Sequence, residues 1–326
     1  FASMAKAIRI HEVGGPDVLK WESVEVGDPG PGEVRIRQDA AGLNYIDVYH
    51  RTGLYPQSLP FTPGVEGAGV VESIGTGVSE LKAGDRVAYA GPIGGYAEER
   101  LIAADRLVKL PDSIATEQAA AMMLKGMTAH MLLRSVHRVE PGETILIHAA
   151  AGGVGLIVCQ WAKALGATVI GTVGSDEKAE LARVHGCDHP IVYTRHDFVA
   201  EVERITNGAK LPVVYDSIGK DTFPKSLDCL RPRGLMVSFG NASGPVDSFP
   251  PAVLAQKGSL FLTRPTLFSY IASRDELETA ANDLFAVVES GQVKVEVKQR
   301  YPLEDAAQAH RDLEARKTTG STILTV

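Results

Sequence analysis

The sequence has few cysteines, and their positions exclude two common uses of that residue. Its 326 residues include three, Cys159, Cys187 and Cys229, which lie far apart. They form neither a CxxC pair nor a zinc-finger spacing, and an odd number argues against a disulfide framework. We therefore expect each of them to be a small, buried, apolar side chain.

Long apolar runs, a signal segment and a basic cluster are also missing. No run approaches the roughly 20 apolar residues of a membrane-spanning helix, and no charged-then-apolar segment precedes Met4. The net charge of −7 is spread along the chain, without the basic cluster that nucleic-acid binding requires. With 44% apolar and 22% charged residues, the composition is that of a globular protein. We expect a cytoplasmic protein with neither a membrane nor a nucleic-acid partner.

The first part of the chain predicts short strands. Apolar and polar residues alternate over 34–37, and residues typical of strands recur at 69–71 and 86–89. Turn sequences rich in glycine and proline, such as 29–32 and 91–92, separate these runs. Strands of this length between such turns indicate a partly open β-barrel.

The pattern changes near residue 141. A strand predicted at 144–148 leads through a glycine-rich turn into a helix with apolar residues on one face. Strands predicted at 168–173, 191–193 and 213–215, and another at 235–239, alternate with helices. This alternation is typical of an α/β protein with a parallel, doubly wound Rossmann sheet.

The end of the chain is assigned to the first domain. The last strand of the parallel sheet is predicted at 259–262, whereas 293–326 is predicted as strand, helix and strand without the rhythm of a βαβ unit. We therefore predict a discontinuous catalytic domain, with a cleft between it and a dinucleotide-binding domain. The predicted bounds are 4–124 and 266–326 for the first domain and 125–265 for the second.

The sharpest motif is the segment Ala-Ala-Ala-Gly-Gly-Val-Gly at 149–155. It lies between a predicted strand and a predicted helix, where glycine lets the backbone approach a pyrophosphate and the helix N-terminus attracts the anion. A tight structural turn is the alternative, but the strand–loop–helix context favours nucleotide binding. The predicted binding residues are Gly152, Gly153, Val154 and Gly155.

The end of the second strand of this sheet selects between the two nicotinamide dinucleotides. NAD enzymes usually carry an acid there, which accepts hydrogen bonds from the ribose hydroxyls. This chain has Gly174 and Ser175 instead, with Lys178 one helical turn further on and Tyr193 at the end of the third strand. These residues leave room and donors for a 2′-phosphate, so we predict NADPH as the cofactor.

Nearby acids count against that choice. Asp176 and Glu177 follow directly, although acids at the start of a helix also stabilise its dipole. A solvated surface lysine is the alternative role of Lys178.

These motifs and the segments around them resemble the medium-chain dehydrogenase/reductase superfamily over nearly the whole chain. Within it, the sequence is most similar to the zinc-free NADPH:quinone oxidoreductases, the subgroup that includes zeta-crystallin. The segments that carry the resemblance are 41–47, 64–69, 124–128, 148–155, 214–217 and 237–241. The resemblance implies a Rossmann domain joined to a GroES-like, partly open β-barrel domain.

The resemblance also implies a protein without zinc. The zinc-dependent alcohol dehydrogenases carry a cysteine ligand in the segment matched by 43–45 and a histidine before the residue matched by Glu66. This chain has Asn44 and Val65 at those places, and it lacks the four-cysteine cluster of a structural zinc. Asparagine, valine and one glutamate cannot form a three-ligand zinc site.

The same resemblance assigns further residues to the site. Asn44, Tyr49, Lys125 and Thr128 are the predicted catalytic residues beside the nicotinamide, and Asn44 and Thr128 also bind the cofactor. A packed tyrosine is the alternative for Tyr49, and a surface lysine is the alternative for Lys125. The remaining predicted cofactor residues are Ile218, Phe239, Gly240, Asn241, Ser243 and Arg316.

The resulting hypothesis is NADPH-dependent reduction of small quinones. Because a hydroquinone anion is a weak base that water can protonate, the protein mainly has to hold the nicotinamide C4 near its acceptor. One alternative is a zinc-free NADPH-dependent reductase of activated C=C bonds in enals or enones, with Tyr49 or Tyr55 as proton donor. The other is a binding or structural role of the crystallin or RNA-binding kind.

The apolar strand predicted at 259–263 is expected to close one edge of the parallel sheet. An unprotected apolar edge invites pairing with another chain. Pairing of this strand across a two-fold axis would give a homodimer.

Overall fold

The computed structural model describes residues 3–326, and they form two compact units. The first unit comprises the chain up to Met127, Ala272–Phe285 and Val295–Val326, and the second comprises Thr128–Ile271 and Ala286–Lys294. Within the described range, no helix is both long and apolar enough to cross a bilayer.

This division differs from the predicted bounds at one segment in particular. Residues 286–294 were predicted in the first domain but group with the second unit. In that unit Gln160 Nε2 donates to Lys294 O at 3.0 Å, and Lys294 N donates to Gln160 Oε1 at 2.9 Å. The pair of hydrogen bonds links the segment to a helix more than 100 residues earlier in the chain, which a sequence pattern does not reveal.

The second unit is built on a six-stranded parallel sheet with the order β10-β9-β8-β11-β12-β13. Its strands are β8 (Thr144–Ile147), β9 (Thr168–Val173), β10 (His189–Val192), β11 (Leu211–Asp216), β12 (Leu230–Ser238) and β13 (Phe261–Thr263). Strands are added outward in both directions from β8 and β11, which is the order of a doubly wound Rossmann sheet. The predicted α/β fold class is confirmed.

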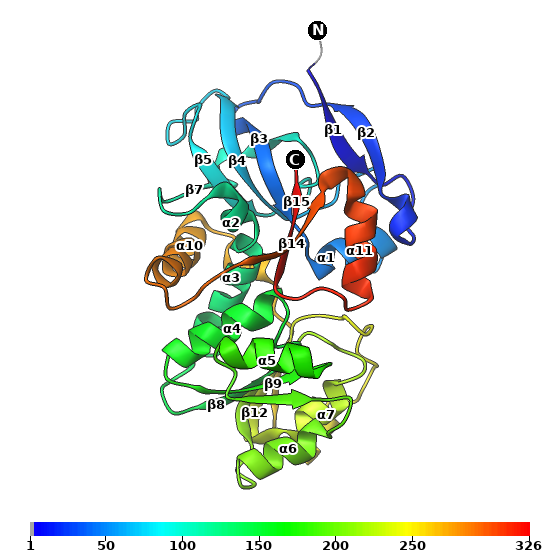
Figure 1. Cartoon of the computed structure of the whole chain (residues 1–326), viewed down its shortest axis with the longest axis vertical. Helices are drawn as coiled ribbons and strands as arrows, with labels where there is room; N and C mark the ends of the chain where they lie inside the picture. The colour runs from blue at the N-terminus through cyan, green and yellow to red at the C-terminus, as the bar shows by residue number, and fades with distance from the viewer. Residues whose placement is uncertain (1–2) are drawn as a thin grey trace. The chain divides into compact units, whose positions relative to one another are not determined.

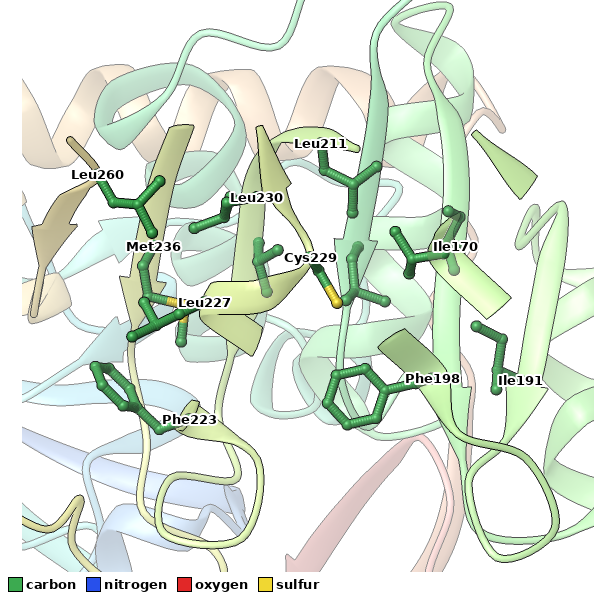
Figure 2. Close-up of a cluster of buried hydrophobic side chains, with 13 residues drawn as sticks. Ile170, Ile191, Phe198, Leu211, Phe223, Leu227, Cys229, Leu230, Met236 and Leu260 are labelled. Atoms are coloured by element: carbon green, nitrogen blue, oxygen red, sulfur yellow. The ribbon is translucent and has the colours of Figure 1, made fainter. Parts of the chain in front are cut away.

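Helices cover both faces of this sheet (Figure 1). Helices α4 (Gly153–Ala164) and α5 (Asp176–Val184) lie on one face, and α6 (Phe198–Ile205) and α7 (Phe223–Asp228) lie on the other. Figure 2 shows the buried cluster of this unit, in which Phe223 and Leu227 of α7 lie near Met236, and Phe198 of α6 lies on the side of Ile170 and Ile191. The other helices of this unit are the π-helix η3 (Met131–Val136), α8 (Ala252–Gln256) and α9 (Leu267–Tyr270).

Local sequence sets where these helices begin and end. Ser175 Oγ accepts from Lys178 N at 3.2 Å at the start of α5. Such a side-chain cap satisfies an N–H group that has no partner within the helix. Helix α4 is followed by Gly166, whose φ of 89° lies in the left-handed region that glycine favours.

The first unit is built on a seven-stranded sheet with the order β14-β15-β3-β4-β5-β7, in which β6 also pairs with β3, and on a separate β1-β2 pair. Its strands are β1 (Met4–Arg9), β2 (Lys20–Glu25), β3 (Glu33–Gly42), β4 (Glu66–Ile74), β5 (Arg86–Ala90), β6 (Glu99–Ala103), β7 (Val108–Lys109), β14 (Val297–Pro302) and β15 (Ser321–Thr325). The long strand β3 pairs antiparallel with β4, β6 and β15. Strand β3 is therefore central to the sheet, and the predicted strands at 34–37, 69–71 and 86–89 lie within β3, β4 and β5.

The helices of the first unit lie between these strands in the chain order. They are η1 (Pro16–Val18), α1 (Tyr45–Thr52), η2 (Ala104–Arg106), α2 (Thr116–Ala120), η4 (Leu303–Asp305) and α11 (Ala306–Glu314). Helix α3 (Met123–His130) and helix α10 (Arg274–Glu289) each contribute residues to both units. One buried apolar cluster includes Val34, Val71 and Val87, and another includes Ile8 and Leu324.

The reading of the C-terminal segment as lacking a βαβ unit is wrong. Strands β14 and β15 pair in parallel, with Arg300 beside Ile323 and Tyr301 beside Leu324, and α11 forms the connection between them. This unit belongs to the first unit of the structure. The strand, helix and strand predicted for 293–326 are present, and the error lies in how the two strands pair.

Strand β13 is the last strand of the parallel sheet in the observed order, as expected. It is shorter than the predicted 259–263, because Ser259 has a φ of 56° and Leu260 is buried in the core. Phe261 is 62% exposed and Leu262 is 38% exposed. The strand therefore presents apolar side chains at the edge of the sheet.

Candidate active site

The glycine-rich loop lies where the sequence places it, between β8 and α4. Gly152 is the N-cap of α4, and Gly153, Val154 and Gly155 form its first turn. Ala150 N donates to Thr172 O at 3.0 Å, and Gly152 N donates to Ala149 O at 3.0 Å. The loop is thus fixed by its own backbone at the positive end of a helix, which suits a pyrophosphate.

The requirement for glycine is strictest at Gly155. A Cβ at this position would lie 2.2 Å from Ala149 O and 2.7 Å from Ala150 C. At Gly152 a Cβ would come within 3.3 Å of Ala149 O, which is tight but tolerable by comparison. The loop therefore needs Gly155 for close packing of helix and loop.

Four predicted residues come together at the carboxyl ends of β9 and β10. Gly174 and Ser175 follow β9, and Tyr193 follows β10 with its N–H donating to Val173 O at 3.1 Å. A Cβ on Gly174 would lie 3.1 Å from the Tyr193 hydroxyl, so this ring extends over the glycine. Lys178 lies in the first turn of α5, with its N–H bound to Ser175 Oγ. The structure thus brings small residues and hydroxyls together at this edge of the sheet, next to the helical turn that carries Lys178.

A second group of predicted residues lies at the carboxyl ends of β11 and β12. Ile218 O accepts from both the backbone N–H and the hydroxyl of Ser243, each at 2.8 Å. A Cβ on Gly240 would lie 2.7 Å from Ser217 O, so the two loops touch at this glycine. Phe239 N donates to Asp216 O at 2.9 Å, and Asn241 O accepts from Gly244 N at 2.9 Å. The loops that follow these two strands are therefore held as one surface.

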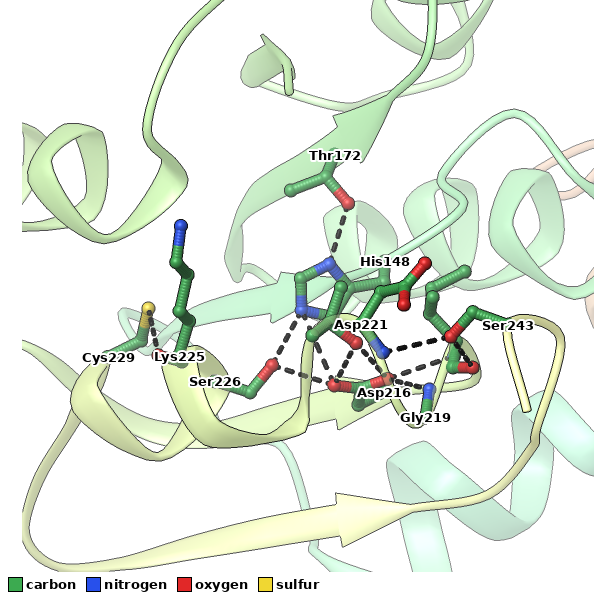
Figure 3. A network of polar contacts seen from close by, with 11 residues as sticks. His148, Thr172, Asp216, Gly219, Asp221, Lys225, Ser226, Cys229 and Ser243 are labelled. Atoms are coloured by element: carbon green, nitrogen blue, oxygen red, sulfur yellow. Dashed lines mark hydrogen bonds and ion pairs between the residues drawn. The ribbon is translucent and has the colours of Figure 1, made fainter. Parts of the chain in front are cut away.

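A buried polar network connects these loops (Figure 3). His148 Nε2 lies 2.8 Å from Ser226 Oγ, and its Nδ1 lies 2.7 Å from Thr172 Oγ1. The Ser226 hydroxyl donates its proton to Asp216 Oδ2 at 2.7 Å. It must therefore accept from His148 Nε2–H, which leaves Nδ1 to accept from the hydroxyl of Thr172. Burial lowers the pKa of His148, against the opposing charge of Asp216, and so favours this neutral form.

Asp216 is the end point of that network. Its Oδ1 accepts from Ile218 N at 2.9 Å and from Gly219 N at 3.1 Å, and Thr222 Oγ1 lies within 2.8 Å of both oxygens. The carboxylate is 1% exposed but is fully hydrogen-bonded, as a buried charge requires. The network ties the ends of β8, β9 and β11 together, and sequence reasoning missed it because its members lie on four separate elements.

In the first unit, Lys125 and Asn44 both bind Glu66. Lys125 Nζ lies 2.6 Å from Glu66 Oε1, and Asn44 Nδ2 lies 2.9 Å from the same oxygen. Leu124 N donates to Glu66 Oε2 at 2.7 Å. Glu66 is fully buried and Lys125 is 4% exposed, so the alternative of a surface lysine is excluded. The sequence signal for Glu66 is its position as a lone acid in a run of glycine and apolar residues.

A chain of hydrogen bonds positions the start of α1. Arg51 Nη1 donates to His310 Nδ1 at 2.7 Å, so His310 carries its proton on Nε2 and donates it to the Tyr96 hydroxyl at 3.1 Å. Tyr96 in turn donates to Asp47 Oδ2 at 2.6 Å, and the same oxygen accepts from Asn44 N at 3.0 Å. Asp47 thus holds Asn44 in place, which supports a structural role for it.

Burial shifts the pKa values of His310 and Asp47, two titratable groups in this chain of hydrogen bonds. It lowers the pKa of His310 to about 3, assisted by the charge of Arg51. It raises the pKa of Asp47 to about 7, against the hydrogen bond from Tyr96.

Three further predicted residues, Tyr49, Thr128 and Arg316, lie on different elements. Tyr49 is 8% exposed and packs edge to face on Tyr55, with ring centroids 5.1 Å apart. Thr128 lies on α3 and belongs to the second unit. Arg316 follows α11 in the first unit, with a φ of 60° and an exposed side chain.

Asn44, Val65 and Glu66 do not fit a zinc ion, although Asn44 and Val65 stand where zinc-dependent alcohol dehydrogenases have zinc ligands. The Lys125 ammonium group binds Glu66. A positive charge beside Glu66 would repel a metal ion. Within residues 3–326, no group of three or more histidine, cysteine, aspartate or glutamate side chains could hold a metal.

Comparison with known proteins defines the family. Residues 30–112 match the alcohol dehydrogenase GroES-like domain, and residues 153–286 match the zinc-binding dehydrogenase domain. The chain therefore belongs to the medium-chain dehydrogenase/reductase superfamily, in its quinone oxidoreductase group.

Individual relatives match nearly end to end. The chain is 55% identical to a quinone oxidoreductase of Pseudomonas aeruginosa, over 98% of this chain and 99% of that protein. It is 48% identical to a 2-haloacrylate reductase of a Burkholderia species, over 98% of this chain and 99% of the other. The solved structure of Escherichia coli quinone oxidoreductase complexed with NADPH superposes with a TM-score of 0.97 at 50% identity, covering 99% of this chain and all of that one.

Proposed function

We propose that this protein catalyses the NADPH-dependent reduction of small quinones. The observation that carries the proposal is the 51–55% identity, over 98% of this chain, to proteins named quinone oxidoreductase. The reaction converts quinone, NADPH and a proton into hydroquinone and NADP⁺. Bound NADPH would supply the reducing equivalents from its nicotinamide C4.

The second unit supplies the residues that would hold the cofactor. The first turn of α4 would bind the pyrophosphate, and Gly174, Ser175, Lys178 and Tyr193 would bind the 2′-phosphate. The surface formed by Ile218, Phe239, Gly240, Asn241 and Ser243 would bind the ribose and nicotinamide. We assign residues 125–265 to this role and retain Thr128 and Arg316 as further cofactor contacts.

The first unit, which includes segment 4–124 and most of segment 266–326 of the proposed catalytic domain, would supply the residues beside the acceptor. Glu66 binds the Asn44 amide nitrogen, so the Asn44 carbonyl oxygen is the atom that would accept from a ligand. Lys125 balances the buried charge of Glu66 and so fixes Asn44, and Tyr49 would form an aromatic wall of the acceptor site. The quinone requires orientation and exclusion of water more than it requires an acid.

A second candidate activity is the reduction of activated C=C bonds. The relative named 2-haloacrylate reductase favours it, since a haloacrylate is an alkene conjugated to a carboxylate. The fold and cofactor would be unchanged, and Tyr49 or Tyr55 would be the candidate proton donor.

A turnover screen separates the two activities. Purified protein is mixed with NADPH or NADH and with benzoquinone, naphthoquinone, 2-chloroacrylate or an enone, and oxidation of the nicotinamide is followed by absorbance. We expect the quinones to be reduced fastest and NADPH to be preferred. Faster turnover of 2-chloroacrylate or the enone would replace the proposal by the second candidate, and no turnover of any acceptor would leave a binding role.

We also propose that the protein is a cytoplasmic homodimer without a metal ion. Pairing of β13 with its copy across a two-fold axis would cover the exposed Phe261 and Leu262 side chains. Sedimentation of the purified protein tests the dimer, and fractionation of cells that express the chain tests its location.

A further inference from the structure

The proposed 2′-phosphate site contains a cation that the sequence pattern did not single out. Arg195 lies three residues beyond the end of β10, and Asp176 lies three residues beyond the end of β9. Arg195 Nη1 lies 2.9 Å from Asp176 Oδ2, and Nη2 lies 2.6 Å from Oδ1. This is a bidentate ion pair between the start of α5, which follows β9, and the loop after β10, and the two strands are parallel neighbours.

The pair lies directly beside the residues that would hold the phosphate. Asp176 immediately follows Ser175, the N-cap of α5, and Arg195 is two residues beyond Tyr193, whose hydroxyl lies over Gly174. A carboxylate in this place would repel the phosphate dianion of NADPH. The Arg195 guanidinium cancels that charge.

The geometry of the guanidinium leaves capacity for a second anion. It carries five N–H donors in a planar fork, and the two contacts with Asp176 use one edge of that fork. The Arg195 side chain is 53% exposed and the Asp176 side chain 75%, so solvent and ligand can reach both. Arginine is the residue best suited to bind a phosphate and a carboxylate together.

We propose that Arg195 is a specificity-determining residue for NADPH, which neutralises Asp176 and donates to the 2′-phosphate. The inference rests on the proposed use of NADPH and deepens it. It explains how a chain with an acid at the start of α5 can accept a phosphorylated ribose. The ligand chemistry in question is a phosphomonoester dianion on a ribose.

Binding of the two dinucleotides to variants tests this role. The dissociation constants of NADPH and NADH are measured by titration of nicotinamide fluorescence for the parent, Arg195→Ala and Asp176→Asn. We expect Arg195→Ala to weaken NADPH by at least about tenfold, the scale of a lost charged hydrogen bond, and to change NADH by less than about twofold. Asp176→Asn is expected to bind NADPH as tightly as the parent or more tightly.

A matched control and a double variant complete the test. Arg183 pairs with Glu180 on the same helix and is similarly exposed, so Arg183→Ala should leave both dissociation constants unchanged. In the Asp176→Asn, Arg195→Ala double variant, NADPH should remain weaker than in Asp176→Asn alone. Recovery of parental NADPH affinity in the double variant would show that Arg195 only screens Asp176 and would overturn the contact with phosphate.

Other outcomes are equally decisive. Equal weakening of NADPH and NADH by Arg195→Ala would indicate a structural role, and no weakening of either would remove Arg195 from the site. Both results overturn the inference while leaving NADPH as the cofactor. A parent protein that does not prefer NADPH would instead contradict the proposed function itself.

Discussion

Replacement of Lys125 by methionine tests how much the buried ion pair with Glu66 contributes to the free energy of unfolding. The Lys125 and Glu66 side chains are 5% and 0% exposed, and Nζ lies 2.6 Å from Oε1. Methionine has a similar length and leaves no large cavity. The variant therefore isolates the loss of the positive charge.

The expected loss of stability in Lys125→Met depends on the hydrogen bonds that the Glu66 carboxylate keeps. Removing one partner of a buried ion pair costs about 3–5 kcal/mol, because the other charge stays buried without compensation. Glu66 would keep its hydrogen bonds from Asn44 Nδ2 and Leu124 N. We therefore expect the free energy of unfolding to fall by about 3 kcal/mol, at the lower end of that range.

Urea unfolding monitored by circular dichroism measures this loss. Lys257→Met is the matched control, since Lys257 pairs with Asp228 but both side chains are partly exposed, at 33% and 42%, and such a pair contributes less than about 1 kcal/mol. Glu66→Gln combined with Lys125→Met replaces the ion pair by neutral groups and should recover much of the loss. A cost for Lys125→Met no larger than for Lys257→Met, or strictly additive effects in the double variant, would refute the reasoning.

Four further predictions address the cofactor, the buried acid, the assembly and the metal. Lys178→Ala should weaken NADPH by roughly 1–3 kcal/mol and leave NADH nearly unchanged, as measured by fluorescence titration; equal effects on both would remove Lys178 from the phosphate site. Asp47 has its pKa raised from 3.8 to about 7, so the folded state holds an extra proton between these values and loses stability as pH rises from 4 to 7. Relative to Asp47→Asn, the parent should therefore lose about 4 kcal/mol over this interval, and parallel stability profiles for the two proteins would contradict it. Phe261→Pro should shift the protein from dimer to monomer in light scattering and destabilise it, whereas a parent that is monomeric at all concentrations would exclude pairing through β13. Elemental analysis should find no stoichiometric zinc, and activity should survive a strong chelator; one tightly bound zinc per chain would show that the argument from Asn44 and Val65 is wrong.

The parallel sheet could be predicted from the sequence because its signals are local. Strand β9 was predicted at its observed bounds, Thr168–Val173, since a short run of strand residues stands between a helix stop and a helix cap. The glycine loop was predicted for the same reason. The strand, helix and strand of the C-terminal segment were predicted too, but the parallel pairing of β14 with β15 was not, because pairing across an intervening helix leaves no periodicity in either strand.

The side-chain contacts of the site could be predicted far less well. Arg195 and Asp176 are 19 positions apart, and Lys125 and Glu66 are 59 positions apart. Each pair depends on how strands and helices from different parts of the chain are brought together. The sequence shows Asp176 as an acid that counts against NADPH, but Arg195, which pairs with it, follows another strand.

The buried network of the second unit shows why residue types alone do not define a mechanism. Ser226, His148 and Asp216 are the three side-chain types of a hydrolytic triad. In such a triad the serine donates to histidine and the histidine donates to the acid. Here the histidine donates to Ser226, and Ser226 donates to Asp216.

Because these hydrogen bonds run in the opposite direction to those of a triad, Ser226 cannot act as a nucleophile. The serine proton is held by a carboxylate, and Ser226 is fully buried, so no substrate can reach its oxygen. Each donor in the network is used to hold the next element, from Thr172 on β9 to the backbone N–H groups of Ile218 and Gly219 beyond β11. These strand ends form the edge at which a dinucleotide binds in this fold, so we propose that the network positions the residues of the proposed cofactor site.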